Sequence, residues 1–178
     1  RRALDAIDGG RFVDEVVAVD GADTDEGPRR GSTLEKMAGL RTLQPGGRLT
    51  AAVSSQISDG ASAVLVASED AVRAHGLTPV AKVHSLAVAG SDPILMLTGP
   101  IDATRKALAR SGLSVDDIGL WEVNEAFASV VLAWHQELGV DLDRVNVNGG
   151  AIALGHPIGA SGTRIMTSML SEMRRTGT

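Results

Sequence analysis

Short apolar runs alternate with helix-length segments along most of this 178-residue chain, and this alternation limits the possible fold more than any other feature. Strands are expected at residues 12–19, 64–67, 80–88, 118–123 and 145–147. Helices are expected at residues 33–40, 69–75, 102–111, 125–138 and 161–176, with a helix-start box at 114–117. Strands separated by helices of this length need crossover connections, so the sequence predicts an α/β fold with a largely parallel sheet covered on both faces.

Composition narrows the class of protein further. The chain is 43% hydrophobic and 22% charged, and no run approaches the ~18 apolar residues of a membrane span, so a soluble protein is expected. A net charge of −5 argues against general affinity for nucleic acid. With no cysteine there are no disulfides or thiolate metal sites, and four scattered histidines predict no metal site of another kind.

The N-terminal end of the sequence has two further implications. The first ten residues lack the apolar core of a signal peptide, so a cytoplasmic location is expected. They begin without methionine and read as the last turns of a helix that ends at Gly9 and Gly10. We therefore expect the true start to lie upstream and the chain to be a piece of a longer protein.

The glycine turn, residues 149–162 (GGAIALGHPIGASG), is the first candidate site because it follows an expected strand and carries a single histidine, His156. Glycines at this density allow close backbone approach and positive φ angles. Pro157 holds His156 in an extended setting rather than inside a helix. The spacing G-x-x-x-G-x-x-G is neither a dinucleotide fingerprint nor a triphosphate loop, so both nucleotide-binding interpretations are set aside.

Asn124 follows the expected strand 118–123 in the way that the glycine turn follows strand 145–147. If these strands are neighbours, Asn124 and His156 converge at one sheet edge, where ligands of open α/β sheets collect. An amide and an imidazole there can donate hydrogen bonds to a developing oxyanion. The alternative is structural, with Asn124 capping the next helix and His156 making an ordinary hydrogen bond.

A long polar excursion, residues 20–47, separates the expected core elements and carries a local basic stretch. The stretch consists of Arg29, Arg30, Lys36, Arg41 and Arg48. These side chains fit a phosphorylated small molecule, or they form a solvated face.

Five segments together resemble the thiolase family of acetyl-CoA C-acyltransferases. They are TLEKMAGLR (33–41), SSQISDGASAVLVAS (54–68), LTGP (97–100), EVNEAFA (122–128) and VNGGAIALGHPIGASGTR (147–164). The resemblance implies a thiolase-like α/β fold: a mostly complete second α/β half, with a parallel-rich mixed sheet between helices, plus part of a loop domain, and with the last strands missing. It places residues 1–70 at the end of the N-terminal region, with the loop domain at about 20–49 and the second half starting near 50. Residues 77–178 are implied to be a truncated C-terminal domain.

The resemblance also implies site residues and a reaction. His156 helps to activate a nucleophilic cysteine and donates to the thioester oxygen, while Asn124 holds a water that donates to the same oxygen. Both family cysteines are implied to lie outside this chain. Residues expected near coenzyme A, a substrate rather than a permanently bound cofactor, are Ser55, Met96, Ala126 and Phe127 at the pantetheine, and Arg29 near the nucleotide end.

Two residues depart from the family pattern, since Val53 stands where asparagine is usual and Gln56 where many members have glycine.

The full-length protein is expected to be a CoA-dependent acyltransferase in lipid degradation and a homodimer or homotetramer, and no membrane partner is expected. The alternative is a non-catalytic CoA-binding subunit or a partner of a split thiolase, which the absence of cysteine motivates.

Overall fold

The computed structural model describes all residues, 1–178. Its α-helices are α1 (Arg2–Asp8), α2 (Leu34–Ala38), α3 (Glu69–His75), α4 (Gly99–Ser111), α5 (Ala128–Leu138), α6 (Ala151–Leu154) and α7 (Ser161–Thr176). Three 3₁₀ turns complete the regular structure: η1 (Ala51–Val53), η2 (Val115–Asp117) and η3 (Leu142–Arg144). None of these helices is long and apolar enough to cross a membrane.

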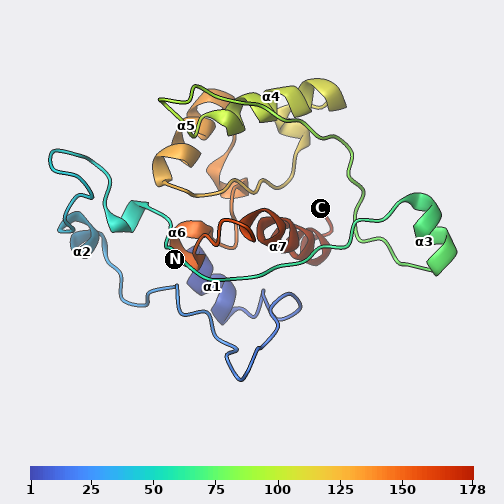
Figure 1. Cartoon of the computed structure of the whole chain (residues 1–178), viewed down its shortest axis with the longest axis horizontal. Coiled ribbons are helices and arrows are strands. Elements are labelled where there is room, and N and C mark those ends of the chain that lie inside the picture. Colours follow the sequence, from blue (N-terminus) through green and yellow to red (C-terminus); the bar gives the residue numbers. More distant parts are fainter.

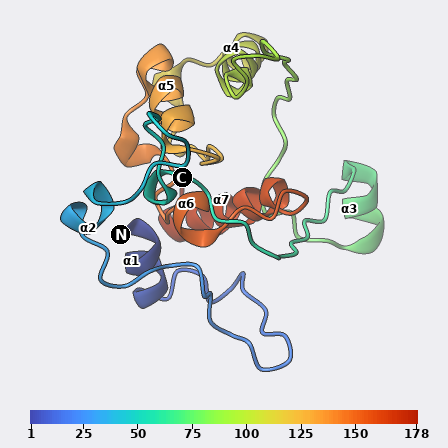
Figure 2. The same ribbon diagram turned by 60° about the vertical axis from the view of Figure 1, so that its left-hand side comes forward.

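Helix α7 lies near the middle of the molecule, with α4 and α5 together on one side and α1 on the other (Figures 1 and 2). The Arg2 side chain joins α1 to the C-terminal half by donating to the carbonyl oxygen of Val145 at 2.6 Å. Helix α3 stands apart at the tip of an excursion in both views. The elements that surround the glycine turn therefore come from both ends of the chain.

The hydrophobic core is small and lies beneath α4 and α5. It is built from Ile101, Val123, Trp134, Val140 and Val145. Trp134 packs edge-on against Trp121, with ring centroids 5.2 Å apart, and its indole N–H donates to the Thr104 hydroxyl at 3.0 Å. Val123 and Val145 anchor two segments in this core, residues 121–127 and residues 145–148. Both segments lead into the site.

The expected helices are confirmed, with shifted starts in two cases. Helices α3 and α7 have the predicted bounds, and α2 lies inside the predicted 33–40. Helix α4 begins three residues earlier than expected, at Gly99, and α5 begins three residues later, at Ala128. The start box at 114–117 caps only the short turn η2. Helix α6, inside the glycine turn, was not expected.

The expected strands are realised only in part, because no segment forms a regular ladder in this chain. The prediction for residues 12–19 is wrong: this segment begins in turns, and Val13 and Val17 are exposed. Segments 64–67 and 80–88 run without ladder partners. Segments 118–123 and 145–147 meet in one parallel bridge, Trp121 to Val145. An extended segment becomes a strand only where a neighbour supplies hydrogen-bonding groups in register.

The chain exposes much more surface than a self-contained domain of its size. Its accessible surface is 12161 Å², whereas a compact monomer of 18.4 kDa exposes roughly 8200 Å². Only 18 of the 178 residues are buried, so most apolar side chains of the segments between the helices face solvent.

Candidate active site

Two segments carry the predicted catalytic side chains, and the core holds them side by side. The Trp121 N–H donates to the Arg144 carbonyl and the Asn146 N–H donates to the Trp121 carbonyl, both at 2.9 Å. The two segments run parallel at this bridge, so their next residues emerge at the same edge. One leads to Asn124 and the other into the glycine turn.

Asn124 and His156 meet as the sequence predicts. The Asn124 amide nitrogen lies 3.3 Å from His156 Nε2, and both side chains are partly buried. Asn124 does not cap α5, because the residue before that helix is Phe127 and no side chain caps it. The capping alternative for Asn124 is therefore excluded.

Ser161, the first residue of α7, sets the orientation of the imidazole. Its buried hydroxyl oxygen lies 2.6 Å from His156 Nδ1 and donates in turn to the Pro157 carbonyl at 3.1 Å. Because the serine proton is used on Pro157, Nδ1 is assigned as the N–H donor to Ser161. Nε2 then carries the lone pair that accepts from Asn124. Sequence reasoning missed Ser161, since nothing in its spacing distinguishes it from a helix-start serine.

This arrangement has a defined chemical capacity. The lone pair of a neutral imidazole at Nε2 can accept a proton, and the resulting N–H can donate to an oxyanion. The Asn124 amide offers a second donor beside it, and its Oδ1 is buried without a hydrogen-bond partner. A base with an amide group beside it suits acyl-transfer chemistry.

Three of the five predicted coenzyme A residues lie together beside this pair. The Ser55 N–H donates to the Ala126 carbonyl at 2.9 Å, and Ser54 forms an antiparallel bridge with Phe127. These contacts place Ser55 beside Ala126 and Phe127, the two residues that precede α5.

The structure does not join Met96 or Arg29 to this group by any hydrogen bond. Met96 is 56% exposed, in a turn with positive φ. Arg29 is exposed and its guanidinium makes no hydrogen bond or salt bridge, while its neighbour Arg30 pairs with Asp8. Within this chain the basic stretch makes one surface ion pair, Arg30 with Asp8, and both interpretations of it stay open.

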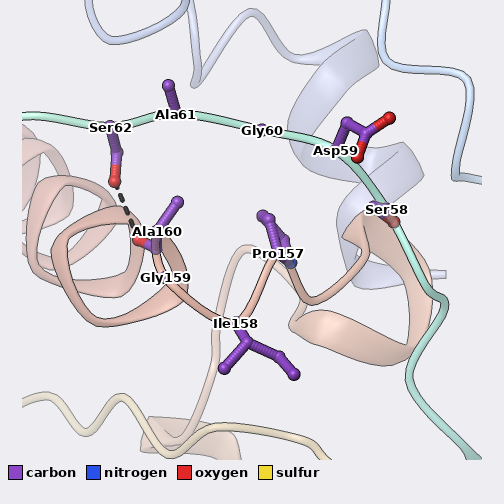
Figure 3. A pocket seen from close by; sticks show the side chains of 9 residues that line it. All are labelled: Ser58, Asp59, Gly60, Ala61, Ser62, Pro157, Ile158, Gly159 and Ala160. Atoms are coloured by element: carbon purple, nitrogen blue, oxygen red, sulfur yellow. Dashed lines mark hydrogen bonds between the residues drawn. The ribbon is translucent and has the colours of Figure 1, made fainter.

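A hollow of about 440 Å³ opens next to the site, where residues 58–62 face residues 157–160 (Figure 3). The Ser62 hydroxyl donates to the Ala160 carbonyl at 2.8 Å and closes one end of the hollow. Ile158, an apolar residue two positions after His156 in the glycine turn, is 86% exposed to solvent.

A partly buried residue, Glu122, lies two residues before Asn124 and has one buried carboxyl oxygen, Oε2. Burial raises the pKa of this carboxyl to about 8, although the nearby guanidinium of Arg164 acts in the opposite direction. The carboxylates of Glu125, Glu15 and Glu172 raise it further. Its Oε2 has no hydrogen-bond partner, and neither do Nε and Nη1 of Arg164.

The pH dependence of stability follows from this shift. Because the folded-state pKa of about 8 lies above the ordinary value of 4.5, the folded protein binds this proton more tightly between those pH values. We predict that the free energy of unfolding of the full-length protein, relative to Glu122→Gln, falls as pH rises through this window, by up to about 5 kcal/mol. Denaturant unfolding at pH 5 and pH 8.5 measures the difference. A difference that is the same at both pH values would contradict the prediction.

Comparison with known proteins identifies the class to which this fold and site belong. The thiolase C-terminal domain model matches residues 77–178, and the thiolase N-terminal domain model matches residues 1–70. The chain belongs to the thiolase family.

Individual relatives agree with this assignment. The chain is 57% identical to the steroid 3-ketoacyl-CoA thiolase FadA6 of Mycobacterium tuberculosis, over 99% of this chain and 44% of the relative. It is 48% identical to an acetyl-CoA acetyltransferase of Pseudomonas aeruginosa, over 98% of this chain and 47% of that protein. The chain thus spans less than half the length of these relatives.

Solved structures confirm the predicted α/β fold class. The crystal structure of human mitochondrial 3-ketoacyl-CoA thiolase in complex with CoA superposes with a TM-score of 0.95 at 44% identity, over 99% of this chain and 46% of that one. An acetyl-CoA acetyltransferase of Bacillus anthracis gives 0.91 at 39% identity, over 99% and 47%. The backbone therefore follows a thiolase-like α/β fold although its strands make few ladder contacts within this chain.

Proposed function

We propose that this chain is the C-terminal part of a CoA-dependent thiolase that cleaves 3-ketoacyl-CoA by thiolysis or condenses two acyl-CoA molecules. The observation that carries the proposal is the pairing of Asn124 with His156 at 3.3 Å, which puts a base and two oxyanion donors in one place. The names of its relatives, 3-ketoacyl-CoA thiolases and acetyl-CoA acetyltransferases, support the same reaction class.

In this proposal the nucleophile is a cysteine thiol outside the chain, as the family resemblance implies. His156 Nε2 takes the thiol proton while the sulfur bonds to the 3-keto carbon of the substrate. The bond between C2 and C3 then breaks, its electrons form the enolate of acetyl-CoA, and a second cysteine protonates that enolate. The thiol of CoA finally takes the acyl group from the enzyme sulfur.

Asn124 and the protonated His156 stabilise the negative charge that develops on the thioester oxygen. Each such donor typically contributes about 3 kcal/mol to the transition state. Asn124 acts through a water in this proposal, since its Nδ2 already lies within hydrogen-bond distance of Nε2.

Coenzyme A is proposed to enter beside the start of α5. In this proposal Ser55, Ala126 and Phe127 contact the pantetheine, and the backbone contacts of Ser55 with Ala126 and of Ser54 with Phe127 support it by holding these residues together. The similar human enzyme was solved in complex with CoA. Roles for Met96 at the pantetheine and for Arg29 at the nucleotide stay predictions. We further propose the domain division given by the sequence, with a loop-domain segment at about 20–49 and the second half from near 50.

The direct test is an assay of the full-length protein with acetoacetyl-CoA plus CoA, and then with longer and bulkier 3-ketoacyl-CoA substrates. Loss of thioester absorbance on one of them is expected. Absence of turnover on all of them would contradict the proposal.

The cytoplasmic location and the dimeric or tetrameric state stay predictions, to be measured by fractionation and by light scattering.

The absence of cysteine keeps one other function open, a non-catalytic CoA-binding subunit of a split thiolase. The neighbouring coding sequence distinguishes the two. A continuous reading frame with cysteines on both sides supports the thiolase, whereas start and stop codons at these ends support the separate subunit.

Ser161 provides a test of how the histidine is oriented. Removing its hydroxyl in Ser161→Ala leaves Nδ1 without its acceptor, so the imidazole loses its fixed tautomer. We predict that kcat falls roughly tenfold while KM for CoA stays within about twofold, because a lost hydrogen bond of this kind is worth about 1 kcal/mol. Steady-state kinetics of the full-length variant measure both constants. Ser161→Thr, which keeps a hydroxyl, should retain more activity; equal losses in the two variants would contradict the assignment.

A further inference from the structure

Helix α6, with only four residues, lies inside the glycine turn and ends two residues before His156. A helix of this length is not stable by itself, because one turn fixes many dihedral angles for very few hydrogen bonds. Most of its N–H and C=O groups also lack partners within the helix. Other parts of the protein must therefore hold α6, and whatever holds it also sets the position of His156.

The carboxylate of Glu125 binds the amide end of α6. Its Oε2 accepts from the Ile152 N–H at 3.1 Å, and its Oε1 accepts from the Asn146 side-chain amide, also at 3.1 Å. Asn146 is buried and exchanges two further hydrogen bonds of 2.8 Å with the backbone of Val123. Glu125, which follows Asn124 directly, is thus held by Asn146 of the neighbouring segment 145–148.

Gly150 permits this close approach of the carboxylate. A Cβ atom at position 150 would lie 2.3–2.6 Å from the three carboxyl atoms of Glu125. The φ angle of Gly150 is −141°, a value that any residue can adopt, so the requirement for glycine is one of space alone.

The carboxamide of Gln56 binds the carbonyl end of the same helix. Its Nε2 donates to the carbonyl oxygens of Ile152 at 3.2 Å and Ala153 at 2.9 Å. The same nitrogen lies 3.0 Å from the Gly27 carbonyl, and the Gln56 backbone carbonyl accepts from the His156 N–H at 3.0 Å. Gln56 therefore contacts α6, His156 and the loop that precedes Arg29.

We propose that Glu125 and Gln56 are positioning residues that hold α6 from its two ends and so set the distance between His156 Nε2 and Asn124 Nδ2. Neither side chain contacts the reacting atoms, and both act through His156. Each side chain suits the end of α6 that it binds. The Glu125 carboxylate has only acceptors and binds a backbone N–H, whereas the Gln56 carboxamide has donors and binds backbone carbonyl oxygens. The catalytic consequence rests on the proposed function.

Gln56→Glu in the full-length protein is the sharpest test at the carbonyl end. It keeps the size of the side chain but turns its donors into a carboxylate that faces three carbonyl oxygens. We expect kcat to fall by roughly 10- to 100-fold, with KM for the acyl-CoA within about threefold. Hydrogen–deuterium exchange of the peptide that covers residues 150–158 should accelerate roughly tenfold or more. Gln136→Glu on the exposed face of α5 is the matched control and should change neither quantity.

A double-mutant cycle tests the amide end. Gly150→Ala alone should displace the Glu125 carboxylate and accelerate the same exchange, whereas adding it to Glu125→Ala should have little further effect. Full additivity of the two substitutions would overturn the assignment of Glu125. If Gln56→Glu does not fold, Gln56→Ala replaces it, with the same expectations.

The exchange measurement separates this inference from the proposed function. Wild-type exchange in Gln56→Glu and in Gly150→Ala overturns the positioning role, whether or not the protein is a thiolase. If the wild-type full-length protein is active, faster exchange in the variants with an unchanged kcat also overturns the positioning role, because α6 would then not control the site. Faster exchange in a full-length protein without thiolase activity supports the structural part and contradicts only the proposed function.

Discussion

Residues 1–178 expressed alone are expected to aggregate or to unfold at low denaturant, without acyl-CoA turnover. The chain exposes roughly 4000 Å² more surface than a compact monomer of its mass. If even a quarter of that excess is apolar, the missing burial corresponds to about 25 kcal/mol, which exceeds the 5–15 kcal/mol net stability of an ordinary domain. Segments 64–67 and 80–88 also have backbone groups with no ladder partner, which favours association between chains.

Size-exclusion chromatography and thermal unfolding monitored by circular dichroism measure this outcome, with the full-length protein as the control. The full-length protein is expected to elute as a defined oligomer and to unfold cooperatively. A soluble monomer of residues 1–178 with one sharp transition would contradict the prediction and would favour the separate-subunit alternative.

His156→Ala in the full-length protein is expected to lower kcat by about 100-fold or more. The substitution removes the atom that accepts a proton and the N–H that donates to the oxyanion, and each role typically contributes a factor of this size. The free energy of unfolding should change much less than the activation barrier, because the ring is only partly buried.

Steady-state kinetics with acetoacetyl-CoA and CoA measure the effect, with denaturant unfolding as the check on folding. His75→Ala, at the exposed end of α3, is the matched histidine control and should retain wild-type kcat. A rate for His156→Ala within about threefold of wild type would refute its catalytic role.

Most helices could be predicted because their signals are local. Helix α3 is capped by the Ser68 hydroxyl at its start and by Gly76 with positive φ at its end, and α7 ends in the same way at Gly177. The order of apolar runs predicted a largely parallel sheet, but that the segments before Asn124 and before His156 are neighbours is shown by the parallel bridge between Trp121 and Val145.

The strands could not be predicted as reliably, because a strand depends on a partner that is remote in sequence. The valine-rich segment 12–19 has high β-propensity, yet it begins in turns and its valines stay exposed, since it pairs only through a local bridge between Val19 and Ala22. Met96 and Arg29 were assigned by resemblance alone, and within this chain no hydrogen bond joins them to the other site residues.

The sequence by itself determined most of the helices and the α/β class and marked Asn124 and His156 as candidates, since caps, periodicity and turn residues act over a few positions. Only the tertiary structure decided how that pair is held. Gln56 meets α6 across almost a hundred residues of chain, and Glu125 meets it across 27. Contacts of this kind leave no periodic pattern, because they depend on how the chain closes its loops and which buried groups then need partners.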